Sequence, residues 1–162
     1  MYAGSAIIYR VGETRYGTYP TREWAVPLGT MLATITAESL RGVSGGVGQV
    51  IDGLHASGTR GLVWRGTVRE FEEVDREGGP RETRVSTVVR LDAQLVRAAD
   101  DSVVWQGFAE ARRAVVPPNA MPAVVDGLAD AAHAAIEELV RNAEPALRSP
   151  AVQRAVSAHH AP

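Results

Sequence analysis

Side chains that could bind a metal or transfer a proton are few in this sequence. There is no cysteine, which excludes disulfides, thiolate catalysis and cysteine-based zinc sites. His133 falls on the polar face of an expected helix, with Asp130 and Glu137 nearby but no HExxH or HxH spacing. We interpret it as a solvated side chain. The other histidines are His55, His159 and His160. The sequence therefore predicts no metal site and no cofactor.

Acidic and hydroxyl side chains are the other candidates for catalysis, because paired carboxylates can carry out acid–base chemistry. An acidic cluster consists of Glu70, Glu72, Glu73 and Asp75. Arginines flank it beside a polar loop at residues 75–80, so we interpret it as a solvated rim. The serines Ser86, Ser102 and Ser157 lack a GxSxG motif. We predict no catalytic residues, and we expect that the protein is not an enzyme.

A glycine-rich run at residues 42–48 has the composition of a phosphate-binding loop. It follows an expected helix instead of leading into one, and it lacks the Gly-Lys-Ser/Thr sequence that holds phosphates. We interpret it as the exit from that helix. The net charge of −2 likewise gives no basis for nucleic-acid binding, which needs a clustered positive surface. All 17 basic residues are arginine.

Aromatic residues gather in one segment, residues 15–32, which leads into the first expected helix. It contains Tyr16, Tyr19, Trp24 and Pro27. Aromatic side chains mark contact surfaces, but they also close the ends of hydrophobic cores. The favoured interpretation is a core cap in which Trp24 covers the end of a sheet and is mostly buried. The alternative is a partner-binding surface made of the four named residues.

These residues must be positioned by strands and helices, which the hydrophobic pattern predicts. Residues 84–98 alternate most regularly, with Val85, Val89 and Leu91 among those expected to face a core. Apolar residues at i, i+3, i+4 and i+7 predict helices over residues 27–41 and 119–142, the second capped by Asn119 and ended by Pro145. The remaining expected strands are residues 6–10, 15–19, 62–69 and 103–114.

This order predicts an α+β fold: a mostly antiparallel sheet of four to five strands with the two helices packed on one face. With 162 residues the chain fits one domain. We assign residues 1–143 to that domain and residues 144–162 to a flexible or loosely helical tail. No run approaches the ~18 consecutive apolar residues of a membrane-spanning helix, and no signal peptide is visible at the N-terminus.

The aromatic segment also carries a resemblance to a known family. Tyr9-Arg10, Tyr16, Tyr19, Trp24-Ala25-x-Pro27 and Met31-Leu32 resemble the "YR…Y…W-A-x-P…ML" run of the ABC-type transport auxiliary lipoproteins, which include the paraquat-inducible C-type proteins encoded beside MCE-domain transporters. The likeness continues through Gly66-x-Val68-x-x-Phe71, Leu95-Val96-Arg97 and Val104-Trp105-Gln106-x-Phe108, and covers residues 2–142.

The resemblance implies a non-catalytic periplasmic accessory protein of an MCE-type system that moves lipids between the inner and outer membranes. Its implied partners are the MCE-domain protein and the ABC permease and ATPase of the same system, with attachment to the outer membrane through a lipid anchor. The family supplies no catalytic residues. This sequence departs from the pattern at Leu28, where a second proline is common, and in its C-terminal tail.

Two further questions stay open at this point. A stand-alone envelope-assembly or secretion-associated interaction domain is the alternative function, and homo-oligomer formation is open as well. The family pattern also begins before Met1, with a first strand and a lipid-bearing cysteine. We therefore expect either an upstream segment, or an exposed strand edge that a second copy covers.

Overall fold

The computed structural model describes residues 4–44, 61–76, 85–118 and 120–149. Within these ranges, five strands and two helices occur in the order β1 (Ala6–Val11), β2 (Arg15–Glu23), α1 (Leu28–Ser44), β3 (Leu62–Asp75), β4 (Val85–Arg97), β5 (Val103–Ala114) and α2 (Met121–Leu147). The strands form one sheet in the order β2-β1-β3-β4-β5, in which all neighbours are antiparallel except β1 and β3. The α+β prediction with a mostly antiparallel sheet is confirmed.

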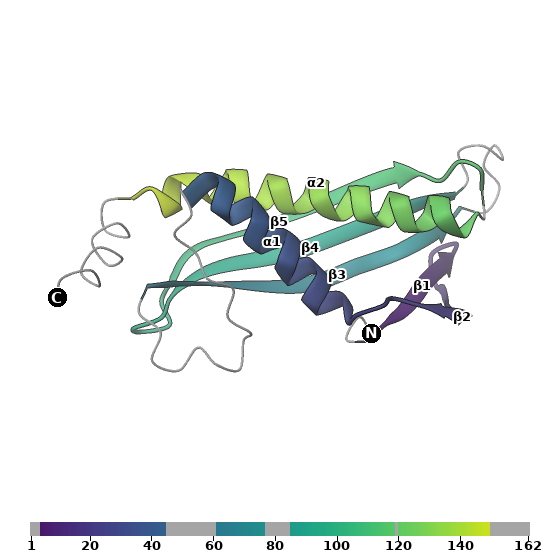
Figure 1. Cartoon of the computed structure of the whole chain (residues 1–162), viewed down its shortest axis with the longest axis horizontal. Coiled ribbons are helices and arrows are strands. Elements are labelled where there is room, and N and C mark those ends of the chain that lie inside the picture. The colour runs from purple at the N-terminus through teal and green to yellow at the C-terminus, as the bar shows by residue number, and fades with distance from the viewer. Residues whose placement is uncertain (1–3, 45–60, 77–84, 119, 150–162) are drawn as a thin grey trace.

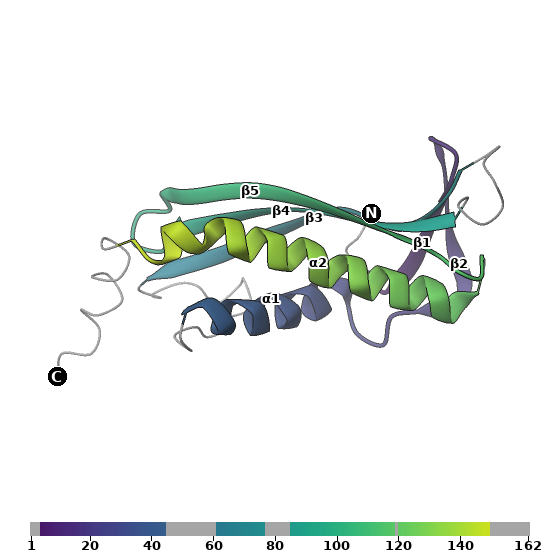
Figure 2. The ribbon, with the colours of Figure 1, turned by 90° about the horizontal axis from the view of Figure 1, so that it is seen from above.

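Both helices lie on the same side of the long strands β3, β4 and β5, as Figure 2 shows from above. We call this side of the sheet the helix face and the other side the open face. The core lies between the helix face and α2, and α1 packs beside α2. The N-terminal hairpin, β1 and β2, lies at one end of the long strands, because β1 pairs only with Glu72–Asp75 of β3 (Figure 1).

Strand β4 confirms the alternation expected from the sequence. Val85, Val89 and Leu91 point to the helix face and are buried in the main hydrophobic cluster. Val88 on the open face is also fully buried, which the alternation did not predict. It lies in register between Glu72 on β3 and Arg112 on β5, so long charged side chains flank it.

Both helices extend beyond the predicted ends. Helix α1 continues through Gly42 because Leu40 and Val43 still pack against the core, which outweighs the cost of about 1 kcal/mol for an interior glycine. Helix α2 contains Pro145 instead of ending before it. Ala143 is fully buried just before this proline, and the Arg148 N–H donates to the Glu144 carbonyl in the last turn. The predicted cap Asn119 and the glycines after Ser44 lie outside the described residues.

Strands β2 and β3 are also longer than predicted. Strand β2 reaches Glu23, which pairs with Ala6, and the Trp24 N–H then donates to the Ser5 carbonyl at 2.7 Å. Strand β3 runs through the whole acidic cluster to Asp75. A β-bulge between Val68 and Glu70 shifts the register of β3 against β4. A tight turn at residues 98–102 joins β4 to β5, where the Arg97 N–H donates to the Ser102 carbonyl.

Candidate functional site

The interpretation of the acidic cluster as a solvated rim was wrong. Glu72 and Glu73 are buried, with exposed fractions of 0% and 3%, and they point to opposite faces of the sheet. A carboxylate can be buried only where partners replace the water it loses. Those partners are Arg10 on β1 and Tyr19 on β2, strands distant in sequence from the end of β3, and sequence spacing gave no sign of them.

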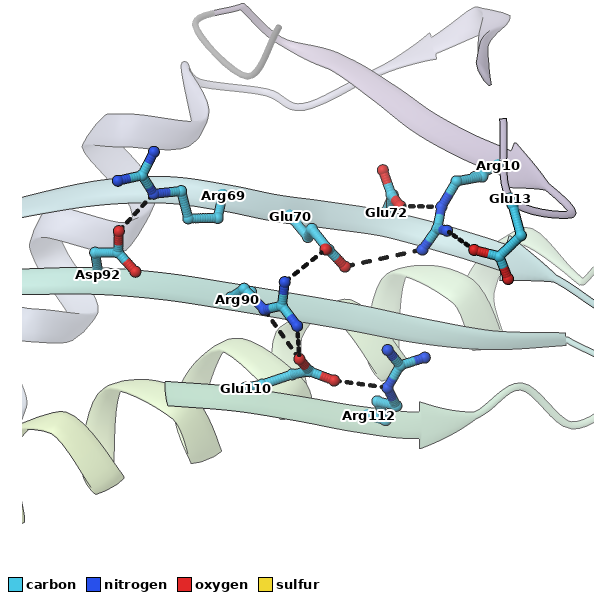
Figure 3. Close-up of polar contacts among 9 residues, drawn as sticks. All are labelled: Arg10, Glu13, Arg69, Glu70, Glu72, Arg90, Asp92, Glu110 and Arg112. Carbon is cyan, nitrogen blue, oxygen red and sulfur yellow. Dashed lines mark hydrogen bonds and ion pairs between the residues drawn. The ribbon is translucent and has the colours of Figure 1, made fainter. Parts of the chain in front are cut away.

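On the open face, charged side chains form a connected row that we call the ionic ladder (Figure 3). The Arg10 Nε donates to Glu72 Oε1 at 2.6 Å, and another Arg10 nitrogen lies 3.8 Å from Glu70. Arg90 on β4 then joins Glu70 at 3.1 Å to Glu110 on β5. The members of the ladder are Glu13, Arg10, Glu72, Glu70, Arg90, Glu110 and Arg112.

The titration of the ladder follows from these contacts. Burial acts to lower the pKa of Arg10, but the hydrogen bond and charge of Glu72 outweigh it and raise that pKa. The hydrogen bonds from Arg112 and Arg90 lower the pKa of Glu110. Each guanidinium group of the ladder lies within ion-pair distance of at least one carboxylate. The ladder can therefore stabilise the register of four strands.

On the helix face, Tyr19 of β2 contacts Glu73 of β3. The Tyr19 hydroxyl donates to Glu73 Oε2, and the Tyr19 ring lies 5.2 Å from the ring of Tyr9 between centroids. A shallow cleft of about 300 Å³ opens here, lined by Tyr9, Arg10, Val11, Tyr19, Pro20, Glu73 and Asp75. Burial and the contact with Glu73 raise the pKa of Tyr19, so the phenol stays protonated and acts as a donor.

The four residues proposed for partner binding do not converge on one surface. Tyr16 is 48% exposed on the open face, where the Arg10 guanidinium lies 5.8 Å from its ring centroid. Tyr19 lies on the helix face, because residues 16 and 19 alternate to opposite sides of β2. Pro27 is exposed and directly precedes α1, with its carbonyl accepting from the N–H groups of Thr30 and Met31.

Trp24 is half-buried and packs edge-to-face on Phe71, with 5.7 Å between ring centroids. It caps the core beside the start of α1, although it keeps more exposure than the sequence led us to expect. Of the four, Tyr16 and Pro27 are exposed, whereas Tyr19 and Trp24 are partly buried by their ring contacts within the fold.

The described residues also bear on metal binding and on membrane-spanning helices. Among the described residues, no three histidine, cysteine or acidic side chains gather in a way that could hold a metal ion. His133 lies exposed on α2, as expected, and the other three histidines lie outside the described ranges. Neither α1 nor α2, the helices of the described residues, is long and apolar enough to span a membrane.

Proteins of known structure share this arrangement of one sheet and two helices. No family model matches the chain, and no curated protein matches it in sequence. The crystal structure of protein XCC0632 from Xanthomonas campestris, assigned to family DUF330, has a TM-score of 0.73 at 19% identity, covering 90% of this chain and 77% of that one. A second crystal structure, of an uncharacterized protein, has a TM-score of 0.66 at 17% identity over 87% and 82% of the two chains.

The PelC dodecamer from Paraburkholderia phytofirmans is a third structure of this kind. Its subunit has a TM-score of 0.51 at 17% identity and covers 90% of this chain and 89% of its own. At these identities the likeness establishes a common fold. It carries no activity or partner from those proteins to this chain.

Proposed function

We propose that this chain is the folded domain of a periplasmic lipoprotein that serves as a non-catalytic accessory component of an MCE-type ABC lipid transporter. The observation that carries the proposal is that the residues of the family resemblance are tied together in the structure. Tyr9 packs on Tyr19, Arg10 contacts Tyr16 and Glu72, and Trp24 packs on Phe71. The resemblance thus rests on interacting residues, as expected of a motif that specifies one fold.

The shared fold gives independent support for this proposal. A likeness over 90% of the chain agrees with the extent of the sequence resemblance, which spans residues 2–142. The absence of a recognisable catalytic constellation among the described residues fits an accessory role built on contact surfaces. We also propose that the protein self-associates, with the dodecameric PelC as the structural precedent.

Co-purification tests the transport assignment. The full-length protein, tagged and extracted from cell membranes in mild detergent, is expected to retain the MCE-domain protein, permease and ATPase encoded beside it. We propose the exposed ring of Tyr16 as a contact residue, so Tyr16→Ala should reduce their recovery. Val103→Ser is the matched control, because Val103 is similarly exposed, at 51%, but lies on β5 at the other edge of the sheet.

The stand-alone alternative gives a different result. An envelope-assembly or secretion-associated domain would recover no transporter component, and its gene would lie away from permease and MCE genes. That outcome, with a normally folded and membrane-attached protein, would contradict the transport proposal. Recovery of the transporter that is unaffected by Tyr16→Ala would keep the proposed function and reject Tyr16 as a contact residue.

A further inference from the structure

The two edges of the sheet differ in how open they are to pairing. Strand β2 carries Pro20, which has no N–H to donate, and charged residues at both ends, features that discourage another strand from adding. Strand β5 forms the opposite edge, is 12 residues long, and contains no proline. No strand of the described residues pairs with its outer side. Phe108, 71% exposed, projects from the open face of this strand.

The charges on β5 alternate in a way that suits an antiparallel copy of the same strand. Glu110 and Arg112 are two residues apart and point to the open face. If two β5 strands pair about a twofold axis at Ala111, each Glu110 lies opposite Arg112 of the other copy. Opposite charges facing each other across strands stabilise the pair. An axis one residue away would instead place Glu110 opposite Glu110, or Arg112 opposite Arg112.

The same register suits the uncharged positions. Phe108 would lie opposite Ala114 of the second copy, which is small enough to let the ring lie flat on the neighbouring strand. Arg112 of that copy would be its diagonal neighbour, within reach of an aromatic side chain and able to make a cation–π contact. The pairing would continue the sheet across both molecules and satisfy outward-facing backbone groups over residues 108–114, the part of β5 in which the two copies overlap.

We infer that the outer edge of β5 is a self-association surface, where a second copy of this chain pairs antiparallel about Ala111. The inference rests on the self-association proposed above and specifies its surface. It is independent of the transport assignment. It is a symmetric contact, so the same residues act in both copies.

Disulfide trapping tests the register, because the chain has no cysteine of its own. In the Ala111→Cys variant the two thiols would face each other across the axis, at a separation that strand pairing and disulfide geometry both allow. Gln106→Cys is the matched control on the same strand, since its two copies would be ~10 residues apart along the pair, or roughly 34 Å. Under mild oxidation we expect a covalent dimer of the first variant only, with unfolding curves confirming that both variants fold.

Charge reversal gives a second measurement that does not need a cysteine. Arg112→Glu would place a carboxylate opposite Glu110 of the other copy at both symmetry-related positions. The dissociation constant of the dimer, measured by sedimentation, should rise about tenfold. Arg113→Glu, one residue along, would face Ala109 of the second copy and should leave the dissociation constant unchanged. A chain that is monomeric at all concentrations would contradict self-association altogether. A self-associating chain with equal cross-linking of both cysteine variants, or equal effects of both reversals, would overturn the β5 surface alone.

Discussion

The phenol of Tyr19 on β2 donates a hydrogen bond to the carboxylate of Glu73 on β3, although β1 lies between these two strands. The contact spans the full width of the N-terminal hairpin and ties its outer strand to the main sheet. On the opposite face, Arg10 of β1 makes the corresponding contact with Glu72. Two neighbouring glutamates of β3 therefore hold the hairpin from both sides.

Removal of the Tyr19 hydroxyl should destabilise the hairpin. Tyr19→Phe keeps the ring contact with Tyr9 but takes a donor from a buried carboxylate, so we expect a loss of about 2 kcal/mol in the free energy of unfolding. Tyr16→Phe is the control, because the Tyr16 ring is about half exposed and the Tyr16 hydroxyl takes no part in the Tyr19–Glu73 contact. Urea unfolding of both variants measures the difference. Equal midpoints would show that the Tyr19 contact contributes nothing.

The burial of Glu73 predicts a pH dependence of stability. Desolvation raises the pKa of Glu73 above its ordinary value of 4.5, despite the opposing hydrogen bond from Tyr19. The folded state therefore binds the proton more tightly than the unfolded state. This contribution to stability is complete below pH 4.5 and is lost as the pH rises through the folded-state pKa.

Glu73→Gln removes that titration while keeping an oxygen that can accept from Tyr19. We expect the variant to be more stable than the parent at pH 7 and to lose less stability than the parent as the pH rises from 4.5. Thermal unfolding between pH 4 and pH 8 follows both effects. Parallel curves for the two proteins over this range would contradict the raised pKa.

The Arg10–Glu72 ion pair should contribute far more to the free energy of unfolding than an exposed ion pair does. Arg10→Met removes the charge beside a fully buried carboxylate, and we expect a cost of about 3 kcal/mol. Arg69→Met removes an equally close pair with Asp92, but both side chains are exposed, so the cost should stay below about 1 kcal/mol. Chemical denaturation compares the two. Adding Glu72→Gln to Arg10→Met should recover part of the loss, and failure to do so would argue against an electrostatic cause.

Glycine at position 17 is required by the ring of Tyr9. A Cβ at Gly17 would lie 2.5 Å from the Tyr9 Cζ and Oη, so Gly17→Ala must displace the Tyr9 ring, which packs on Tyr19. We expect a destabilisation of about 1 kcal/mol. Gly66→Ala is the control in β3, where a Cβ meets nothing within 4 Å and a gain of about 0.5 kcal/mol is expected. Denaturation midpoints that move in the same direction for both would refute the steric argument.

The sequence alone predicted the secondary structure and the fold class of this protein. The alternation over residues 85–95 and the apolar stripes of both helices are local patterns, because each reports which side of one element is buried. They were sufficient to predict an α+β layer with both helices on one face. The boundaries at Pro145 and Gly42 were wrong because packing against the core outweighs local helix propensity there.

Only the tertiary structure determined that Glu72 and Glu73 of the acidic cluster are buried. Glu72 and Glu73 look like solvated residues in the sequence, since an acid is normally buried only beside a partner. Their partners Arg10 and Tyr19 are 62 and 54 residues away and reach them because β1 inserts parallel to β3. Hydrophobic periodicity records the burial of each element, but it contains no information about which distant strand becomes its neighbour. Strand pairing supplies that information, and with it the partners of every buried charge.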